Sequence, residues 1–281
     1  MRVAWFRGAV PASADAHDHA STVLVELSAA HRIDFFTAAT AHDVVWKHFR
    51  APYDVTVFEL DGSARGAFMS AYLPHYSDVA WLRTLAHAGR ATQHSARMLI
   101  APHQSAAMAL RDQFPDMRVA VAPVGVAAAR ACGDVVTAMR WPAGDEPDVA
   151  ALSGMAAGQP VITFEMESTA DWPALDPQTW RPRGRFDGPP IAVTIDPRDE
   201  THSRNLAITR LSRDAALRKE LGTAAQAWWR SNATIERAVA AWTAILTEAA
   251  ALPRPARGPA ADGSRSARGI LAEIGASVDF L

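Results

Sequence analysis

The sequence contains little cysteine, little net charge and no long apolar run. Its single cysteine, Cys132, excludes an internal disulfide and is compatible with a reducing cytoplasm. The formal net charge of −2 argues against a general affinity for nucleic acid or for an anionic membrane surface. No apolar run approaches the length of a transmembrane helix, and the one at the N-terminus is too short for a signal peptide. We therefore expect a cytoplasmic protein that has no transmembrane segment and binds no nucleic acid.

Motifs for metal or phosphate binding are also scarce. His17, Asp18 and His19 form a cluster that invites a metal ion. However, residues two apart do not share a helix face, and no third ligand is spaced to join them. No glycine-rich phosphate loop and no internal repeat is found. We expect neither a metal nor another cofactor.

What the sequence does contain is typical of a globular α/β protein. Its 281 residues are enough for one large or two small domains, and 49% of them are hydrophobic. Short apolar runs alternate with helical patterns, which predicts parallel strands joined by helices. We expect strands at residues 3–6, 32–37, 55–60, 79–82, 96–101, 118–124 and 191–195. We expect helices at residues 20–30, 42–49, 105–114 and 200–221, a helix that begins at 67, and one or two helices within 224–252. We expect a loop rich in proline and arginine at residues 173–190.

The stretch GDVVTAMRWPAGDEPDVAALSGMAAGQPVITFE gives the strongest local prediction. An apolar run at 135–139 is followed by a polar turn and an Ala-, Leu- and Met-rich helix at 148–157. Gly158 ends that helix because glycine adopts a positive φ readily, and Pro160 prevents its continuation. A second apolar run follows at 161–164. The stretch therefore predicts a strand–helix–strand unit of a parallel sheet.

Charged residues lie where this unit would bind a ligand. Arg140 follows the first strand, while Asp145, Glu146 and Asp148 precede the helix. Ligands of α/β proteins bind at the carboxyl ends of parallel strands. The acidic residues could simply complement the positive N-terminal end of the helix. Alternatively, since carboxylates repel phosphate and accept hydrogen bonds from hydroxyls, they could bind a sugar.

The same segment, DVVTAMRWPAGDEP…MAAGQPVI, resembles the donor-binding segment of retaining glycosyltransferases of family 4. The similarity continues in STADWPALDPQTW, in DPRDETHSRNLAITRLSRDAALRKELGTAAQAWW and, upstream, in AHDVVWKHFRAPYDVTVFEL. This resemblance implies the GT-B fold and metal-free transfer of a sugar, with retention, from a nucleotide-sugar donor to a glycan or lipid acceptor. It implies donor binding by Arg140, Asp145 and Glu146.

The resemblance also implies a domain organisation. Residues 1–131 would form a Rossmann-like N-terminal, acceptor-side domain. Residues 132–252 would form a reduced donor-side α/β domain with helices, and residues 253–281 a linker and a C-terminal helix. The acceptor-side cleft would include Gly8, Asp61 and Ser63, which follow the strands expected at 3–6 and 55–60.

The sequence departs from the family pattern in places that matter for catalysis. Gly66 replaces a histidine, and Arg83-Thr84 replaces a His-Asp pair. Arg83 and nearby His87 are the remaining candidates for a catalytic role.

On the donor side, Ser153 replaces the family's second carboxylate. The half-domain whose basic pair grips the donor diphosphate is also missing. The main alternative is therefore a catalytically impaired relative that acts as a binding or scaffold protein, and a third possibility is that a second chain completes the site.

Overall fold

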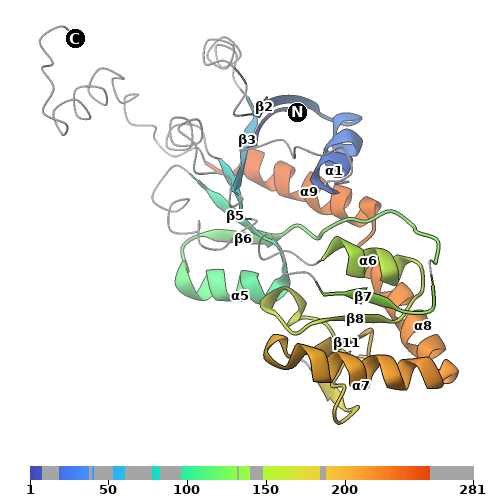
Figure 1. Ribbon diagram of the computed structural model, residues 1–281. Coiled ribbons are helices and arrows are strands. Elements are labelled where there is room, and N and C mark those ends of the chain that lie inside the picture. The colour runs from blue at the N-terminus through green and yellow to red at the C-terminus, as the bar shows by residue number, and fades with distance from the viewer. Residues whose placement is uncertain are drawn as a thin grey trace, which may run out of the picture.

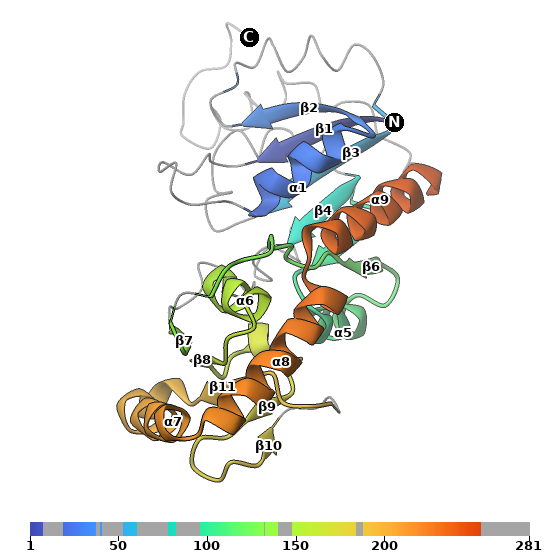
Figure 2. The same ribbon diagram turned by 90° about the vertical axis from the view of Figure 1, so that its right-hand side faces the viewer.

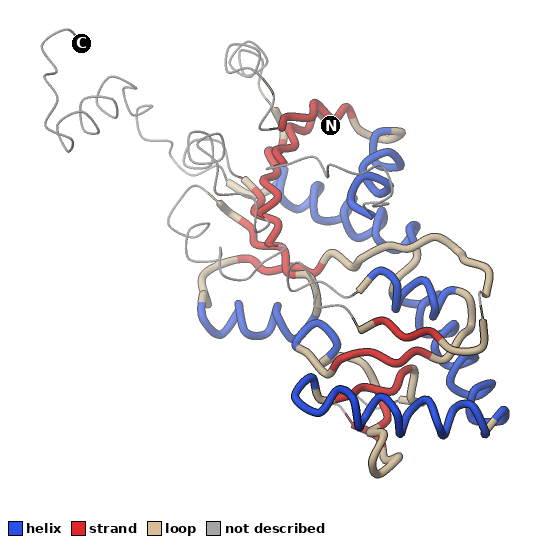
Figure 3. The backbone as a smooth tube through the Cα atoms, viewed as in Figure 1, coloured by secondary structure: helices blue, strands red, loops and turns tan. Residues whose placement is uncertain are grey.

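The structure is a computed structural model that describes residues 1–7, 19–37, 40, 53–60, 78–82, 96–131, 133–139, 148–183 and 188–253. These residues form an α/β, Rossmann-like architecture with two separate sheets and helices packed against them (Figure 1). Figure 3 shows the strands of the two sheets as two groups, with helices beside each. The helices expected at 42–49, from 67 onward and at 268–281, with the linker before the last, lie outside the described residues.

The first sheet has six strands, all parallel, in the order β2-β1-β3-β4-β5-β6. They are β1 (Arg2–Arg7), β2 (Arg32–Thr37), β3 (Val55–Leu60), β4 (Val79–Leu82), β5 (Met98–Ala101) and β6 (Arg118–Val121). Each of these strands overlaps a predicted strand, and the observed and predicted bounds differ by a few residues at most. The order changes direction between β1 and β3, and such a switch point opens a crevice at the carboxyl ends of the strands.

Both faces of the first sheet are covered, because its side chains alternate between two cores. Phe6 stacks on Phe58 in the core shared with α5 (Gln104–Gln113), with ring centroids 4.4 Å apart. On the other face, Trp5 packs against α1 (His19–Ser28) and α9 (Ile235–Ala251). Figure 2 shows α9 beside α1 over this sheet, although α9 comes last among the described helices.

The second sheet has five strands in the order β10-β9-β11-β8-β7. They are β7 (Val136–Ala138), β8 (Val161–Phe164), β9 (Ala174–Leu175), β10 (Pro182–Arg183) and β11 (Ala192–Ile195). All neighbouring pairs are parallel except β9 and β10. Helices α6 (Val149–Ala156) and α8 (Ala215–Asn232) pack in the core on one face. Helix α7 (Glu200–Arg213) packs in the core on the other face, together with the first part of α8.

The predicted strand–helix–strand unit is confirmed. β7 and β8 are parallel and α6 connects them. Asp148 caps α6, because its carboxylate accepts a hydrogen bond of 2.7 Å from the Ala150 N–H. Gly158 ends the helix turn with a φ of +71°. Gly222 of α8 packs against this turn so closely that an added Cβ would lie 2.1 Å from the Gly158 carbonyl oxygen.

Two expectations for the C-terminal half were wrong. The single helix expected at 200–221 is divided into α7 and α8 at Asp214, which has non-helical φ and ψ angles. Its carboxylate accepts a 2.9 Å hydrogen bond from the Leu217 N–H, so Asp214 begins a new helix instead of continuing the old one. The region expected as a loop at 173–190 also contains β9 and β10, which are too short for an apolar pattern to indicate. No helix among the described residues is long and apolar enough to cross a membrane.

Candidate functional site

All eight predicted site residues lie outside the described residues: Gly8, Asp61, Ser63, Arg83, His87, Arg140, Asp145 and Glu146. Their positions in the chain are nevertheless informative. β1, β3 and β4 end at Arg7, Leu60 and Leu82, immediately before Gly8, Asp61 and Arg83. Arg140, Asp145 and Glu146 come after β7, which ends at Ala138. These segments therefore leave from the carboxyl ends of the strands, and a cleft shared by the two groups stays a prediction.

A buried ion pair joins β1 and β3 at the switch point of the first sheet. Arg7 of β1 and Glu59 of β3 are register partners, and the Arg7 Nη2 lies 3.3 Å from the Glu59 Oε1. Their side chains are only 3% and 0% exposed. Arg7 also donates a 3.1 Å hydrogen bond to the Ser21 hydroxyl of α1. Because buried charges are tolerated only when paired, this cluster fixes the ends of the strands that precede Gly8 and Asp61 in the chain.

The two sheets meet where the N-terminus of α5 contacts the segment after β8. His103 caps α5, its Nδ1 accepting a 3.2 Å hydrogen bond from the Ala106 N–H. Asp171, which follows the short helix η2 (Glu167–Thr169), accepts hydrogen bonds from the Ser105 N–H at 3.0 and 3.1 Å, and another from the Ser105 hydroxyl. The carboxylate therefore already occupies the positive end of α5.

Ser105, His103 and Asp171 do not form a catalytic triad. The Ser105 hydroxyl donates to Asp171, whereas a serine nucleophile needs a histidine as its base. The Nδ1 of His103 accepts a backbone N–H and lies 3.8 Å from the nearest Asp171 oxygen. We call the first sheet with α1, α5 and α9 the first unit, and the second sheet with α6, α7 and α8 the second unit. Asp171 of the second unit thus caps α5 of the first unit.

A cavity of about 930 Å³ lies between α5 and the second sheet. Its lining includes Ser105 and Met108 of α5, Glu165 directly after β8, Arg183 of β10 and Thr194 of β11. The guanidinium of Arg183 forms an ion pair with Glu165. Carboxylate, guanidinium and hydroxyl groups at the carboxyl end of β8 make this cavity suitable for a polar, hydroxyl-bearing ligand.

Arg183 has a second carboxylate partner, Asp176. The two side chains form an ion pair, and Asp176 accepts 2.8 Å hydrogen bonds from the N–H groups of Gln178 and Thr179. Burial favours a higher pKa for Asp176, but these N–H groups and the Arg183 cation outweigh it and lower the pKa below its usual value. Asp176 therefore stays ionised and fixes the guanidinium that reaches Glu165.

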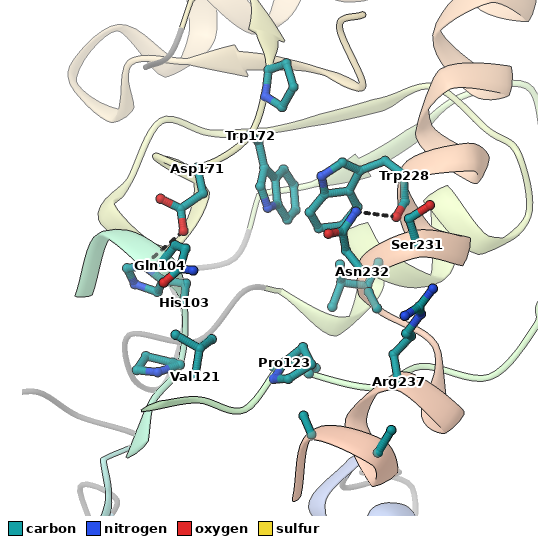
Figure 4. Close-up of a pocket in the computed structure, with 17 residues that line it drawn as sticks. His103, Gln104, Val121, Pro123, Asp171, Trp172, Trp228, Ser231, Asn232 and Arg237 are labelled. Atoms are coloured by element: carbon teal, nitrogen blue, oxygen red, sulfur yellow. Dashed lines mark hydrogen bonds and ion pairs between the residues drawn. The ribbon is translucent and has the colours of Figure 1, made fainter. Parts of the chain in front are cut away.

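A second cavity, of about 620 Å³, lies beside the α5 cap (Figure 4). It is lined by the carboxyl ends of β5 and β6, by Trp172, and by the joint between α8 and α9. Trp172 also lines the larger cavity, so the two cavities are neighbours on either side of the Asp171–Ser105 contact.

No family model matches the chain, and no curated protein matches it. The resemblance to glycosyltransferases therefore rests on the sequence motifs alone.

Sequence reasoning missed Glu165, Asp171 and Arg183. A signal existed for Glu165, because it directly follows the apolar run at 161–164, where a parallel strand presents its ligand-binding end. Asp171 carried no comparable signal, since its partner Ser105 is 66 residues away. Among the described residues, no group of three or more His, Cys, Asp or Glu side chains could hold a metal ion.

Proposed function

We propose that this protein is a glycosyltransferase-like protein of GT-B architecture that takes a sugar from a nucleotide-sugar donor to a glycan or lipid acceptor. One observation carries the proposal. The segments that follow β5 and β8, one from each sheet, meet at the Asp171–Ser105 contact, and a cavity of about 930 Å³ opens beside it. A donor and an acceptor that bind to different sheets would be brought together in such a place.

The return of α9 to the first sheet also supports the proposal. The chain passes from the first sheet to the second at residues 122–135 and returns through the joint between α8 and α9. Trp242 of α9 packs against Trp5 and Trp81, with ring centroids 4.9 Å from each. The two units are thus linked by two chain crossings, between which a cleft could open and close.

In this proposal the second sheet binds the donor. Arg140 and Arg183 would face its diphosphate, while Asp145, Glu146 and Glu165 would accept hydrogen bonds from its sugar hydroxyls.

The first sheet would bind the acceptor near Gly8, Asp61 and Ser63. His87 is the candidate for proton transfer, and Arg83 is the candidate for stabilising negative charge. The bond between the anomeric carbon and the phosphate oxygen would break, and a bond to an acceptor oxygen would form on the same face of the sugar. The acceptor proton would leave with the nucleoside diphosphate.

A catalytically impaired relative is the second candidate, and the N-termini of four helices favour it. The N-termini of α5, α6, α8 and α9 each have a side chain of the protein itself as hydrogen-bond acceptor. Each of these four termini is thus already capped, whereas an uncapped helix N-terminus is a common phosphate site. β7 is moreover an edge strand among the described residues, where a complete doubly wound sheet would continue.

Binding and transfer assays separate these candidates. Purified protein is incubated with UDP, GDP, ADP and their sugars, and the free energy of unfolding is measured. A ligand with micromolar affinity, present at millimolar concentration, stabilises the folded state by about 4 kcal/mol. We expect a nucleotide sugar to do so, and we expect Arg140→Ala and Asp145→Ala to reduce the effect. Arg130→Ala, an exposed residue of the connecting segment, is the control.

The same donors, labelled in the sugar and mixed with a glycan and lipid extract, test for transfer. Slow transfer with retention supports the glycosyltransferase. Binding without transfer supports the impaired relative. If no nucleotide sugar stabilises the protein, the glycosyltransferase is wrong, and a relative that has lost its donor site remains.

A further inference from the structure

The smaller cavity, of about 620 Å³, has aromatic walls at the junction of the two units. Trp172, which is 3% exposed, follows the α5-capping Asp171, and Trp228 projects from α8. Their rings are 5.6 Å apart with an angle of 60° between them. Pro123, after β6, lies opposite in the close-up (Figure 4). The volume is within the range of about 300–1,000 Å³ typical of small-molecule sites.

Polar groups border these aromatic walls. Asp171 lies on one side, while Asn232 and Arg237 lie on the other, at the joint between α8 and α9 (Figure 4). The Asn232 amide donates a 2.8 Å hydrogen bond to the Trp228 carbonyl, which fixes its orientation at the mouth. Arg237 forms no ion pair with any described residue, and its backbone N–H is bonded to the Thr234 hydroxyl of the helix cap. The border thus offers a carboxylate, an amide and a guanidinium.

This combination of groups disfavours two ligand classes. A phosphate would approach the end of α5, where the Asp171 carboxylate already accepts the Ser105 N–H. A single guanidinium on the opposite side does not compensate for that negative charge. An alkyl chain would fill the aromatic part, but it would exclude water from Asp171, Asn232 and Arg237 without offering them a hydrogen bond, which costs free energy.

A neutral saccharide satisfies every part of the cavity. The C–H face of a pyranose is apolar and packs on the electron-rich face of an indole ring. Its hydroxyls donate to a carboxylate or an amide oxygen and accept from an amide or guanidinium. We propose that the cavity lined by Trp172, Trp228, Asn232 and Arg237 is a saccharide-binding site.

The position of the cavity indicates its role. Trp172 lines both this cavity and the larger one between α5 and the second sheet. A saccharide held here could extend past Trp172 into the cleft, so that its remote units are bound while its terminal hydroxyl reacts. This role rests on the proposed function, because it assigns the saccharide as acceptor. The binding itself does not depend on a donor.

The test is direct binding of neutral disaccharides to the full chain. Maltose, cellobiose, chitobiose and α-1,2-mannobiose are titrated in turn, and both tryptophan fluorescence and heat are recorded. We expect saturable binding of at least one, with a change in fluorescence because the sugar contacts indole rings. Trp228→Ala should weaken that binding by about tenfold or more, which corresponds to about 1.4 kcal/mol.

Two polar variants keep the test decisive if Trp228→Ala fails to fold. Asn232 and Arg237 are exposed, so Asn232→Ala and Arg237→Ala should keep the unfolding temperature and still weaken binding several-fold. The matched control is Trp180→Phe. Trp180 lies over Arg210 of α7 and lines neither of the two cavities, so this change should leave the affinity unaltered.

Other outcomes overturn the proposal. Absence of saturable binding by all four disaccharides overturns it, as does binding that Arg237→Ala and Asn232→Ala leave unchanged. UMP and decanoic acid are titrated as well, and stronger effects of either on the same tryptophans would assign the cavity to a nucleotide or a lipid. Failure of nucleotide sugars to bind, with disaccharide binding intact, would remove the proposed function and leave this site standing.

Discussion

The two sheets differ in how they are completed. The first has six parallel strands and uses a helix from the other end of the described chain, α9, to cover one face. The second has shorter strands, and its antiparallel β10 and three-residue β7 form its edges. Its covering helices α6, α7 and α8 all come from its own part of the chain. The first unit therefore depends on residues beyond the second, whereas the second unit does not depend on α9 for its core.

Their charges follow the same contrast. In the first unit the buried Arg7–Glu59 pair lies within the sheet, between strands that are 52 residues apart. In the second unit Arg183 bridges Glu165 and Asp176 at the surface of the larger cavity. Rigid, desolvated charges suit a supporting role, and partly exposed ones suit ligand binding. This difference is consistent with the proposal that ligand-binding groups lie on the second sheet.

The largest expected effect comes from removing the contact of α9 with the first sheet. Trp242 is 1% exposed and packs against Trp5 and Trp81. Trp242→Ala should lower the free energy of unfolding by about 3–5 kcal/mol, because a large cavity remains among the rings. Urea denaturation measures the loss, and hydrogen exchange shows where it falls.

If the first sheet depends on α9 and the second does not, hydrogen exchange in Trp242→Ala rises in β1, β3 and β4 before it rises in β8 and β11. Thr247→Ala, an exposed position on the same helix, is the control. Equal loss of protection in both sheets would show that the two units unfold as one, and would remove the distinction between them.

The frame of this fold could be predicted from the sequence because it is local. Buried parallel strands are continuous apolar runs, and the run at 79–82 coincides with β4. The turn at Gly158 was also visible, since Gly and Pro punctuate helices in a known way.

What could not be predicted depends on contacts between distant residues or on competition between alternatives. The Asp171–Ser105 cap joins two units that no local pattern connects. Asp214 was compatible with an uninterrupted helical pattern, and its capping of α8 decided otherwise. Trp228 and Trp242 lie at a spacing compatible with one face of a single helix. Because α8 ends at Asn232, Trp228 instead lines a cavity and Trp242 packs in the core of the first sheet.

The cap between the units gives an effect of intermediate size. Asp171→Ala should cost about 0.5–2 kcal/mol, because the Ser105 N–H and hydroxyl lose their acceptor at a helix N-terminus. Asp148→Ala is the matched control, since it removes a similar cap from α6 within the second unit.

Both variants should lower stability, but only Asp171→Ala should increase hydrogen exchange at the start of α5 and in η2 together. The contact joins those two segments, and Asp148 joins none across the units. If Asp148→Ala loosens α5 to the same extent, Asp171 is not what links the two sheets.

The smallest effects concern pH, and here one aspartate in each unit can be compared. Asp34 of β2 accepts a 2.8 Å hydrogen bond from the Tyr53 hydroxyl and forms a 3.0 Å ion pair with Arg2. Burial favours a higher pKa for Asp34, but Tyr53 and Arg2 outweigh it and lower the pKa from 3.8. In Asp176 the backbone N–H groups of the β9–β10 turn have the same consequence.

Because both carboxyls have a lower pKa in the folded state, the unfolded chain binds protons more readily. The stability they contribute is therefore present above the unfolded value and is lost as the pH falls through the folded value. Asp34→Asn should lower stability near neutral pH and flatten its decline between about pH 5 and about pH 2. Asp176→Asn should flatten the decline in the same direction. The measurement is a series of urea midpoints across this range, with Asp116→Asn at an exposed turn as the control.

The two substitutions should differ in where the stability is lost. Asp34 connects Arg2 of β1 with Tyr53, which lies two residues before the start of β3. Asp34→Asn should therefore increase hydrogen exchange in the first sheet. Asp176 acts on a local turn and on Arg183, so Asp176→Asn should leave the first sheet unchanged and loosen the guanidinium beside Glu165. A pH profile that neither substitution flattens would contradict the assigned direction of both pKa values. If Asp34→Asn instead increased hydrogen exchange in β8 and β11, the charge near the amino ends of the first sheet would affect the stability of the second sheet.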